Sequence, residues 1–338
     1  MKLIIQIPSL NEEATLPATV ADLPRAVQGF DTVEWLVIDD GSTDRTAQVA
    51  FDLGVDHVVR FTANKGLATA FQAGLDAALK LGADVIVNLD ADNQYSTASI
   101  PDLVAPILRG EADFVVGDRG VGDHPEFSPS KRMLQRLGSW VVRQASGTDV
   151  PDATSGFRAY SRQAALGVNV VTRFTYTLET IIQAGHSGVT VTHVPIAVNP
   201  ATRNSRLFRS KSQYIRRSMG TILRQYVVYR PLRVFMPLAL ACGIIGAVLL
   251  ARFGWYYLTE EGPTGHVQSL VVGSVATLAA IQLAMLGLVA ELLRTNRLIA
   301  EKTLRRVRAL ELAARVEPEG LLQEVDPADL LRSEANRP

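Results

Sequence analysis

Two long uncharged apolar runs constrain this chain more than any other feature of its sequence. Residues 234–251 carry no charged side chain, and neither do residues 267–290. About 20 residues of α-helix, at a rise of 1.5 Å per residue, span the roughly 30 Å hydrocarbon core of a bilayer. A short acidic segment with Glu260 and Glu261 separates the two runs. The pattern therefore predicts a two-helix transmembrane hairpin, with a hairpin buried in a soluble protein as the alternative.

Basic residues flank the expected hairpin on both sides. They are Arg224, Arg230 and Arg233 before it, and Arg294, Arg297, Lys302, Arg305, Arg306 and Arg308 after it. Because cytoplasmic flanks of membrane proteins are rich in Lys and Arg, we expect both flanks in the cytoplasm, at an inner cell membrane. We divide the chain into a cytoplasmic domain (1–205), basic juxtamembrane helices (206–231), the hairpin (232–293, spans about 232–252 and 268–291), and a cytoplasmic helix and tail (294–338).

Upstream of the hairpin, short apolar strands alternate with helical segments. We expect the first strands at residues 3–7, 34–38, 57–61, 84–89 and 113–116. This alternation indicates an α/β fold with a mostly parallel central sheet. The first strand is followed by no Gly-x-Gly-x-x-Gly motif, and the chain has no P-loop motif, which argues against dinucleotide oxidoreductases and P-loop NTPases. Lys plus Arg and Asp plus Glu both number 34, so no basic surplus points to nucleic acid.

Two carboxylates follow the expected strand at residues 84–89. Asp90 and Asp92 are one residue apart, and Gln94 adds an amide oxygen. Ligands of open α/β sheets bind at the carboxyl ends of strands. Proteins usually hold Mg²⁺ with one or two carboxylates plus substrate phosphates. The segment therefore predicts a divalent-cation site for a nucleotide diphosphate, with a solvated turn as the alternative.

Four motifs, in this order, resemble the family 2 glycosyltransferases, whose catalytic domain has the GT-A fold. They are Pro8-x-x-Asn11-Glu12, Asp39-Asp40-Gly41-Ser42-Thr43-Asp44, Asn64-x-Gly66 and Asp90-x-Asp92. The resemblance implies a nucleotide-sugar donor. It implies a base and ribose pocket at the turn 8–12 and Asp40, a donor site that also includes Asp39, Lys65, Gly66 and Asp90, and a cation, Mg²⁺ or Mn²⁺, on Asp90, Asp92 and Gln94.

A further segment, Asp152-Ala153-Thr154-Ser155-Gly156-Phe157-Arg158, resembles the polyprenyl-phosphate branch of the same family. That branch contains the dolichol-phosphate mannosyltransferases and undecaprenyl-phosphate glycosyltransferases. Gly156 would let the backbone approach a ligand closely, and an arginine such as Arg158 can bind a phosphate through two hydrogen bonds. A structural ion pair between Asp152 and Arg158 is the alternative.

Other basic residues are candidates for holding donor and acceptor phosphates. They are Arg119, together with Arg203 and Arg206 in a run that resembles the basic segment before the membrane in the same branch. Attraction to anionic lipid is the other explanation of that run. Residues 120–130, rich in Gly, Pro, His and Asp, are a candidate lid.

The sequence thus predicts a membrane-anchored, inverting hexosyltransferase. It would move a hexose from a UDP- or GDP-sugar to a polyprenyl phosphate, with Asp92, Asp152, Ser155 and Arg158 in its site and Asp152 orienting or deprotonating the acceptor. A homo-oligomer, by resemblance a tetramer, is a further expectation. The alternatives are another lipid acceptor, such as diacylglycerol or ceramide, and a non-catalytic membrane scaffold.

Overall fold

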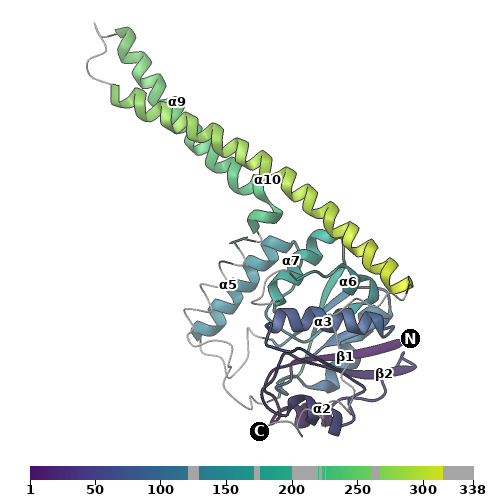
Figure 1. Cartoon of the computed structure of the whole chain (residues 1–338). Coiled ribbons are helices and arrows are strands. Elements are labelled where there is room, and N and C mark those ends of the chain that lie inside the picture. Colours follow the sequence, from purple (N-terminus) through teal and green to yellow (C-terminus); the bar gives the residue numbers. More distant parts are fainter. Residues whose placement is uncertain are drawn as a thin grey trace, which may run out of the picture. The chain divides into compact units, whose positions relative to one another are not determined.

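The structure is a computed structural model that describes residues 1–120, 129–170, 176–199, 220, 223–224, 226–259 and 267–314. The chain divides into two compact units. One comprises Met1–Ile222 and Glu301–Pro338, and the other comprises Leu223–Ala300. The first unit contains a β-sheet covered by helices, and the second contains most of two long helices (Figure 1).

A sheet of seven strands forms the centre of the first unit as far as that unit is described. The strands are β1 (Lys2–Ser9), β2 (Thr32–Asp39), β3 (His57–Arg60), β4 (Val85–Asn88), β5 (Phe114–Asp118), β6 (Arg158–Ser161) and β7 (Val191–Pro195). Their order is β3-β2-β1-β4-β6-β5-β7. All neighbours are parallel except that β6 runs antiparallel to both β4 and β5. The predicted mostly parallel α/β sheet is confirmed.

The reversed strand β6 decides where the segment before it lies. Its first residue, Arg158, is opposite Asn88, the last residue of β4. The chain before Arg158 therefore reaches the sheet at the edge where the chain after Asn88 leaves it. Residues 152–157 and the acidic loop that begins at Asp90 consequently meet, although about 60 residues separate them in sequence.

Helices cover the two faces of the sheet. They are α1 (Leu16–Ala21), α2 (Thr46–Asp52), α3 (Leu67–Lys80), the 3₁₀ helix η1 (Thr97–Ser99), α4 (Ile100–Leu108), α5 (Pro129–Ser146), α6 (Arg162–Gly167) and α7 (Thr177–Ser187). Side chains alternate across a strand, so β1 contributes to both faces. Leu3 and Ile5 join a buried cluster with Leu103 of α4, whereas Gln6 faces α3, where its Nε2 lies 3.4 Å from the Phe71 carbonyl oxygen.

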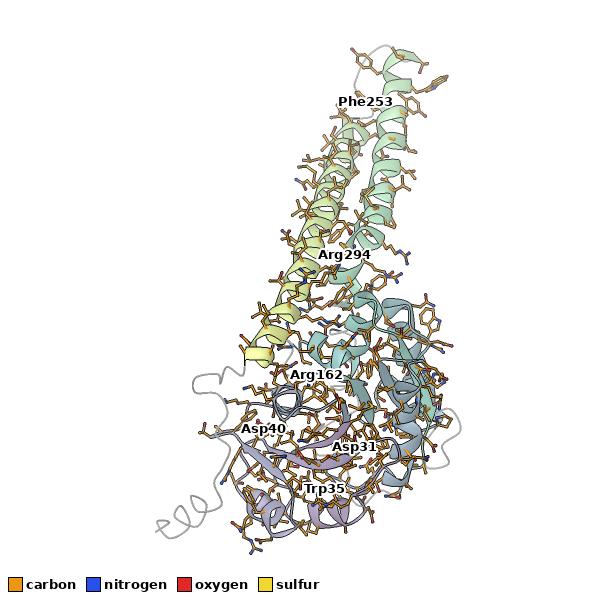
Figure 2. The ribbon with its side chains drawn as sticks, turned by 90° about the vertical axis from the view of Figure 1, so that its right-hand side faces the viewer. Asp31, Trp35, Asp40, Arg162, Phe253 and Arg294 are labelled. Carbon is orange, nitrogen blue, oxygen red and sulfur yellow. The ribbon has the colours of Figure 1, made fainter. Side chains whose placement is uncertain are left out.

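The two long helices are α9 (Pro231–Thr259) and α10 (Val267–Ala314). By length and composition, both are apolar enough to cross a bilayer. Figure 2 shows the two helices with their side chains. They pack through small residues: a Cβ added to Gly246 would lie 2.4 Å from Thr277 Oγ1, and one added to Gly273 would lie 3.1 Å from Leu249. Large apolar side chains such as Leu240 and Leu288 are exposed, as expected of surfaces that face lipid. The short acidic segment between the two helices, residues 260–266, lies outside the described residues.

Helix α10 continues without a break well beyond the apolar run. Its last turns, from Glu301, group with the first unit. There the Arg308 guanidinium donates to the Val168 carbonyl oxygen at 2.7 Å and lies 3.9 Å from the Asp76 carboxylate on α3. A helix is therefore present in the first part of the predicted helix and tail (294–338), as far as Ala314, and its charged end packs against α3.

Candidate active site

The acidic pair at the end of β2 holds the loops on either side of it. Asp40 accepts hydrogen bonds from the backbone N–H groups of Lys65, at 2.7 Å, and Gly66, at 2.9 Å. Burial raises the pKa of Asp40 even though these two donors favour its charged form. Asp39 is fully buried; its Oδ1 accepts from Ser42 N in the loop after β2 at 2.8 Å, and its Oδ2 lies 3.1 Å from Arg60 Nε. In the described structure both carboxylates thus shape the loops at this edge of the sheet.

The turn after β1 is tied to the loop after β2. Asn11 has a φ of 55°, in the left-handed region that asparagine tolerates better than most residues. Its Oδ1 accepts from Thr43 N at 2.8 Å, and its own N–H donates to Ser42 Oγ at 2.9 Å. The Glu12 N–H donates to Thr46 Oγ1 at 2.8 Å. These bonds bring two of the four glycosyltransferase-like motifs together at one edge, next to Pro8 within β1.

The carboxylate pair after β4 lies at the same edge. Asn93, with a φ of 54°, turns the loop back, and Gln94 N lies 3.3 Å from Asp92 Oδ1. Burial and then the neighbouring charge of Asp92 raise the pKa of Asp90 to about 7. The two carboxylates fit a divalent cation, because the cation would remove the repulsion that Asp92 exerts on the charged form of Asp90. Within the described ranges, no group of three His, Cys, Asp or Glu side chains gathers into a metal cage.

A segment far along the chain holds the acidic loop. Ser96 N donates to the Ala197 carbonyl oxygen at 3.1 Å, and Asn199 N donates to that of Gln94 at 2.9 Å. The Asn199 amide also donates to the Asn93 carbonyl oxygen at 3.1 Å. Nothing in the sequence pattern indicated this support. It arises because the chain after β7 runs antiparallel to the loop.

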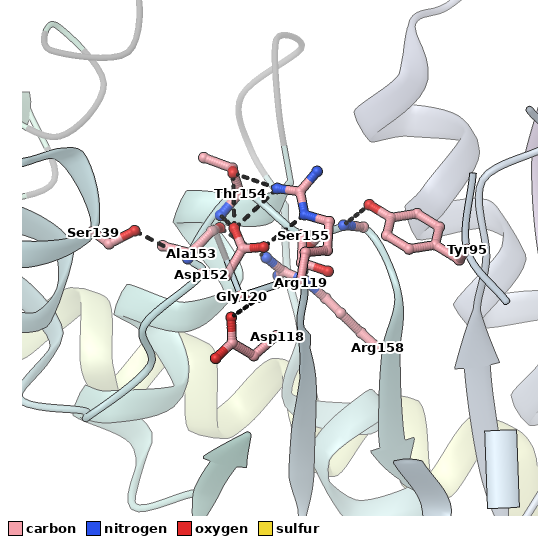
Figure 3. Close-up of polar contacts among 11 residues, drawn as sticks. Tyr95, Asp118, Arg119, Gly120, Ser139, Asp152, Ala153, Thr154, Ser155 and Arg158 are labelled. Carbon is pink, nitrogen blue, oxygen red and sulfur yellow. Dashed lines mark hydrogen bonds and ion pairs between the residues drawn. The ribbon is translucent and has the colours of Figure 1, made fainter. Parts of the chain in front are cut away.

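The partly buried Arg119 and the buried Asp152 form a bidentate ion pair (Figure 3). Arg119 Nε donates to Asp152 Oδ2 at 2.6 Å, and Nη2 donates to Oδ1 at 3.0 Å and to Thr154 Oγ1 at 2.8 Å. Burial by itself would raise the pKa of Asp152, but the guanidinium outweighs it and holds that pKa below its usual range. The ionic partner of Asp152 is therefore Arg119 and not Arg158, which was the alternative that the sequence suggested.

Arg158 has no exposed surface. Its Nε donates to the Ser155 carbonyl oxygen at 2.7 Å and its Nη2 to that of Ala153 at 3.0 Å. Its Nη1 donates to Thr180 Oγ1 at 2.6 Å. In this arrangement the guanidinium shapes the segment that precedes β6. The direct phosphate contact expected of Arg158 stays a prediction.

Gly156 touches the carboxylate of Asp90. A Cβ at position 156 would lie 2.4 Å from Asp90 Oδ2. The Gly156 N–H donates to the Tyr95 hydroxyl at 2.9 Å, and burial raises the pKa of that hydroxyl to about 12. Ser155 is buried, and its Oγ finds no hydrogen-bond partner in the described part of the chain. The close backbone approach predicted at Gly156 is thus an approach to Asp90.

The structure brings most of the predicted site residues to one region. The acidic loop after β4, Arg119 after β5, and the segment 152–158 before β6 lie together, with the turns after β1 and β2 at the same sheet edge. Arg203 and Arg206 lie outside the described residues, as do residues 121–128 of the expected lid. Sequence reasoning missed Tyr176, whose hydroxyl lies 3.5 Å from Asp90 Oδ1. The sequence offered one signal for a buried polar partner of this kind. Gln6 and Asn88 are polar residues in the apolar runs of β1 and β4, and Asn88 donates to the Tyr176 hydroxyl.

Comparison with known proteins identifies similarity to glycosyltransferases. Residues 4–167 match the family model described as glycosyl transferase family 2. The chain is 34% identical over 166 residues to an undecaprenyl-phosphate mannosyltransferase of Micrococcus luteus, covering 47% of this chain and 66% of that protein. It is 30% identical over 204 residues to a polyprenol monophosphomannose synthase of Mycolicibacterium smegmatis, covering 57% and 76%.

A solved structure shares the fold. It is glucosyl-3-phosphoglycerate synthase from Mycobacterium tuberculosis in complex with Mn²⁺, UDP-glucose and phosphoglyceric acid. The TM-score is 0.53 at 23% sequence identity, over 67% of this chain and 79% of that one. At this identity the likeness shows the fold alone.

Proposed function

This chain belongs to glycosyl transferase family 2, and from that membership we propose that it transfers a hexose from a nucleotide-diphosphate sugar to the phosphate of a polyprenyl lipid. The observation that carries the proposal is the meeting of two groups at one sheet edge. The carboxylates of Asp90 and Asp92 suit a cation, and the Arg119 guanidinium, held by Asp152, suits a phosphate. The two relatives named above, by name an undecaprenyl-phosphate mannosyltransferase and a polyprenol monophosphomannose synthase, support this acceptor class.

The donor would lie across the loops after β1, β2 and β4. The turn 8–12 and Asp40 would line the base and ribose, as the family motifs imply, and the backbone near Gly66 would complete the donor site. Asp90, Asp92 and Gln94 would hold Mg²⁺ or Mn²⁺. When bound, the cation would stabilise the negative charge that develops on the diphosphate leaving group. Membership of glycosyl transferase family 2 supports this donor class.

The acceptor phosphate is already an anion, so it needs no strong base. One of its oxygens would form the bond to the anomeric carbon while the bond from that carbon to the donor diphosphate breaks, which inverts the configuration and releases the nucleoside diphosphate. Because Arg119 holds the pKa of Asp152 low, we assign Asp152 the task of positioning Arg119 rather than accepting a proton. Arg119 and Ser155, with Arg203 and Arg206, are the candidates for contact with phosphate.

The apolar helices would keep the enzyme in the bilayer in which a polyprenyl phosphate is dissolved. Their basic flanks favour the cytoplasmic side for the first unit, where nucleotide sugars are made. This assignment makes α9 and α10 an anchor, and it leaves the chemistry to the first unit.

The test is a donor panel on the full chain in detergent with undecaprenyl phosphate. UDP-glucose, UDP-galactose, UDP-N-acetylglucosamine and GDP-mannose are supplied in turn, with Mg²⁺ or Mn²⁺ and a chelator control. We expect a chelator-sensitive glycolipid from one donor, abolished in Asp92→Asn and retained in the matched control Asp102→Asn, an exposed acid at the start of α4. Near-normal turnover of a folded Asp92→Asn protein would refute the cation assignment. Donor binding without a lipid product would refute the polyprenyl acceptor.

A further inference from the structure

Three polar side chains are buried next to the acidic loop, and the proposed function uses none of them. Gln6 in β1 and Asn88 in β4 have no exposed surface, and Tyr176, directly before α7, is 1% exposed. The neighbouring positions in both strands are apolar and buried. A buried polar group costs free energy unless it is hydrogen-bonded, so the partners of these residues reveal what they do.

The three side chains form a chain of hydrogen bonds that ends at Asp90. Gln6 Nε2 donates to Asn88 Oδ1 at 2.8 Å. Asn88 Nδ2 donates to the Tyr176 hydroxyl at 2.9 Å and to the Gly156 carbonyl oxygen at 2.8 Å. The Tyr176 hydroxyl in turn lies 3.5 Å from Asp90 Oδ1.

The direction of donation is fixed by chemistry. An amide nitrogen only donates, so the Tyr176 hydroxyl must accept from Asn88, and its single proton is available to Asp90. If the Asn88 amide were turned over, its oxygen would face the Gly156 carbonyl and its nitrogen would face Gln6 Nε2. Both contacts would pair like with like. The observed orientation therefore pairs both the oxygen and the nitrogen of Asn88, whereas Gln6 Oε1 has no hydrogen-bond partner in the described part of the chain.

Packing also fixes the position of the Tyr176 ring. It stacks on Phe71 of α3 with ring centroids 4.0 Å apart and an interplanar angle of 7°. On the other side of the carboxylate, Gly156 leaves just enough room for Asp90 Oδ2. Asp90 is thus confined between a hydroxyl that faces Oδ1 and a backbone that faces Oδ2.

We propose that Tyr176, oriented by Asn88 and Gln6, is a positioning residue that presents the Asp90 carboxylate to the divalent cation. The inference rests on the proposed function, since it requires the cation. Partners that orient a metal-binding side chain commonly change metal affinity by about 10- to 100-fold when they are removed. Tyr176→Phe removes only the hydroxyl and keeps the stack on Phe71.

The experiment is a Mn²⁺ titration of the full chain in detergent with UDP present, read by electron paramagnetic resonance of the free ion. We expect Tyr176→Phe to remain folded, with a lower melting temperature because Asn88 Nδ2 loses an acceptor. It should weaken Mn²⁺ binding about 10-fold or more, and its kcat should recover at saturating Mn²⁺. Tyr160→Phe is the matched control. Tyr160 is another buried tyrosine beside Phe71, and the centroids of the two rings are 5.9 Å apart. The Tyr160→Phe variant should bind Mn²⁺ as the wild type does.

Three outcomes would contradict the inference. Tyr176→Phe could bind Mn²⁺ with an affinity within twofold of wild type, Tyr160→Phe could weaken Mn²⁺ binding equally, or saturating Mn²⁺ could fail to restore the kcat of Tyr176→Phe.

Asn88→Asp is a second variant of nearly the same shape. It lacks the donor to Tyr176 and should also weaken Mn²⁺ binding. A wild type that does not bind Mn²⁺ would overturn the cation assignment and this inference with it. A Tyr176→Phe protein that loses Mn²⁺ affinity while no lipid donor–acceptor pair reacts would support the inference and refute the proposed function.

Discussion

Replacing Gly156 with alanine tests how closely the segment before β6 must approach the acidic loop. The added Cβ would lie 2.4 Å from Asp90 Oδ2 and 2.9 Å from its Cγ. Position 156 is not among the glycines with a left-handed φ, so its backbone can accept an alanine. The substitution therefore acts by displacing the Asp90 carboxylate.

The size of the effect follows from that distance. An ordinary contact begins near 3.4 Å, so the carboxylate or the backbone must move by about 1 Å. Overpacking a core typically costs about 1–3 kcal/mol, and we expect about 1 kcal/mol here because a carboxylate can rotate where backbone cannot. A displacement of about 1 Å at a reacting site can cost about 100-fold in rate. We thus expect Gly156→Ala to fold and to lose about two orders of magnitude in kcat/KM.

The assay measures glycolipid formation and thermal unfolding on the same purified protein. Gly138→Ala is the control, because a Cβ there meets nothing within 4 Å in the middle of α5. In a helix interior that change should stabilise by about 0.5–1 kcal/mol and leave turnover unchanged. A folded Gly156→Ala protein with kcat/KM within about threefold of wild type would show that the Asp90 position is not critical.

Two further predictions concern ionic contacts in the first unit. Asp152→Asn should lower the free energy of unfolding by about 1–3 kcal/mol at neutral pH, because it removes the negative charge that pairs with the partly buried Arg119 guanidinium. Since the folded pKa of Asp152 lies below the unfolded value of about 3.9, this stabilisation is present above about pH 4 and is lost as the pH falls through the folded pKa. Urea unfolding at pH 7 and pH 3 checks it, and a difference that does not shrink in acid would contradict the assignment. Arg308→Ala should lower the stability of the first unit by about 1–2 kcal/mol, because it removes the contacts to Asp76 and to the backbone near α6. The exposed neighbour Arg306→Ala should change it by less than about 0.5 kcal/mol, and equal effects of the two in thermal unfolding would count against a docked helix end.

The first five strands, the acidic ends of β2 and β4, and the apolar helices could be found from the sequence. The run at 84–89 gave β4, the acidic pair at Asp39 and Asp40 marked the end of β2, and two uncharged runs gave the apolar parts of α9 and α10. These features are local. Apolar periodicity, turn residues and helix length each depend on about 20 consecutive residues or fewer, so they can be recognised without knowing any tertiary contact.

The partners within the site could not be found in that way. Strand β6 enters the sheet in the opposite direction to its neighbours, and this alone brings Gly156 to Asp90. The sequence offered Arg158 as the partner of Asp152, but the fold gives that role to Arg119 and buries Arg158 among carbonyl oxygens. Both arginines suit the pairing chemically, so only their positions decide between them.

The sequence by itself determined which elements form, which chemical groups follow the strands and which segments are apolar enough for a bilayer. Only the tertiary structure decided which of those groups touch. The bond from Asn88 to Tyr176 joins residues 88 positions apart, and the bond from Gln6 to Asn88 joins residues 82 apart. Such pairs depend on strand order and on the direction of β6, which are set by packing of the whole core and leave no local pattern in the sequence.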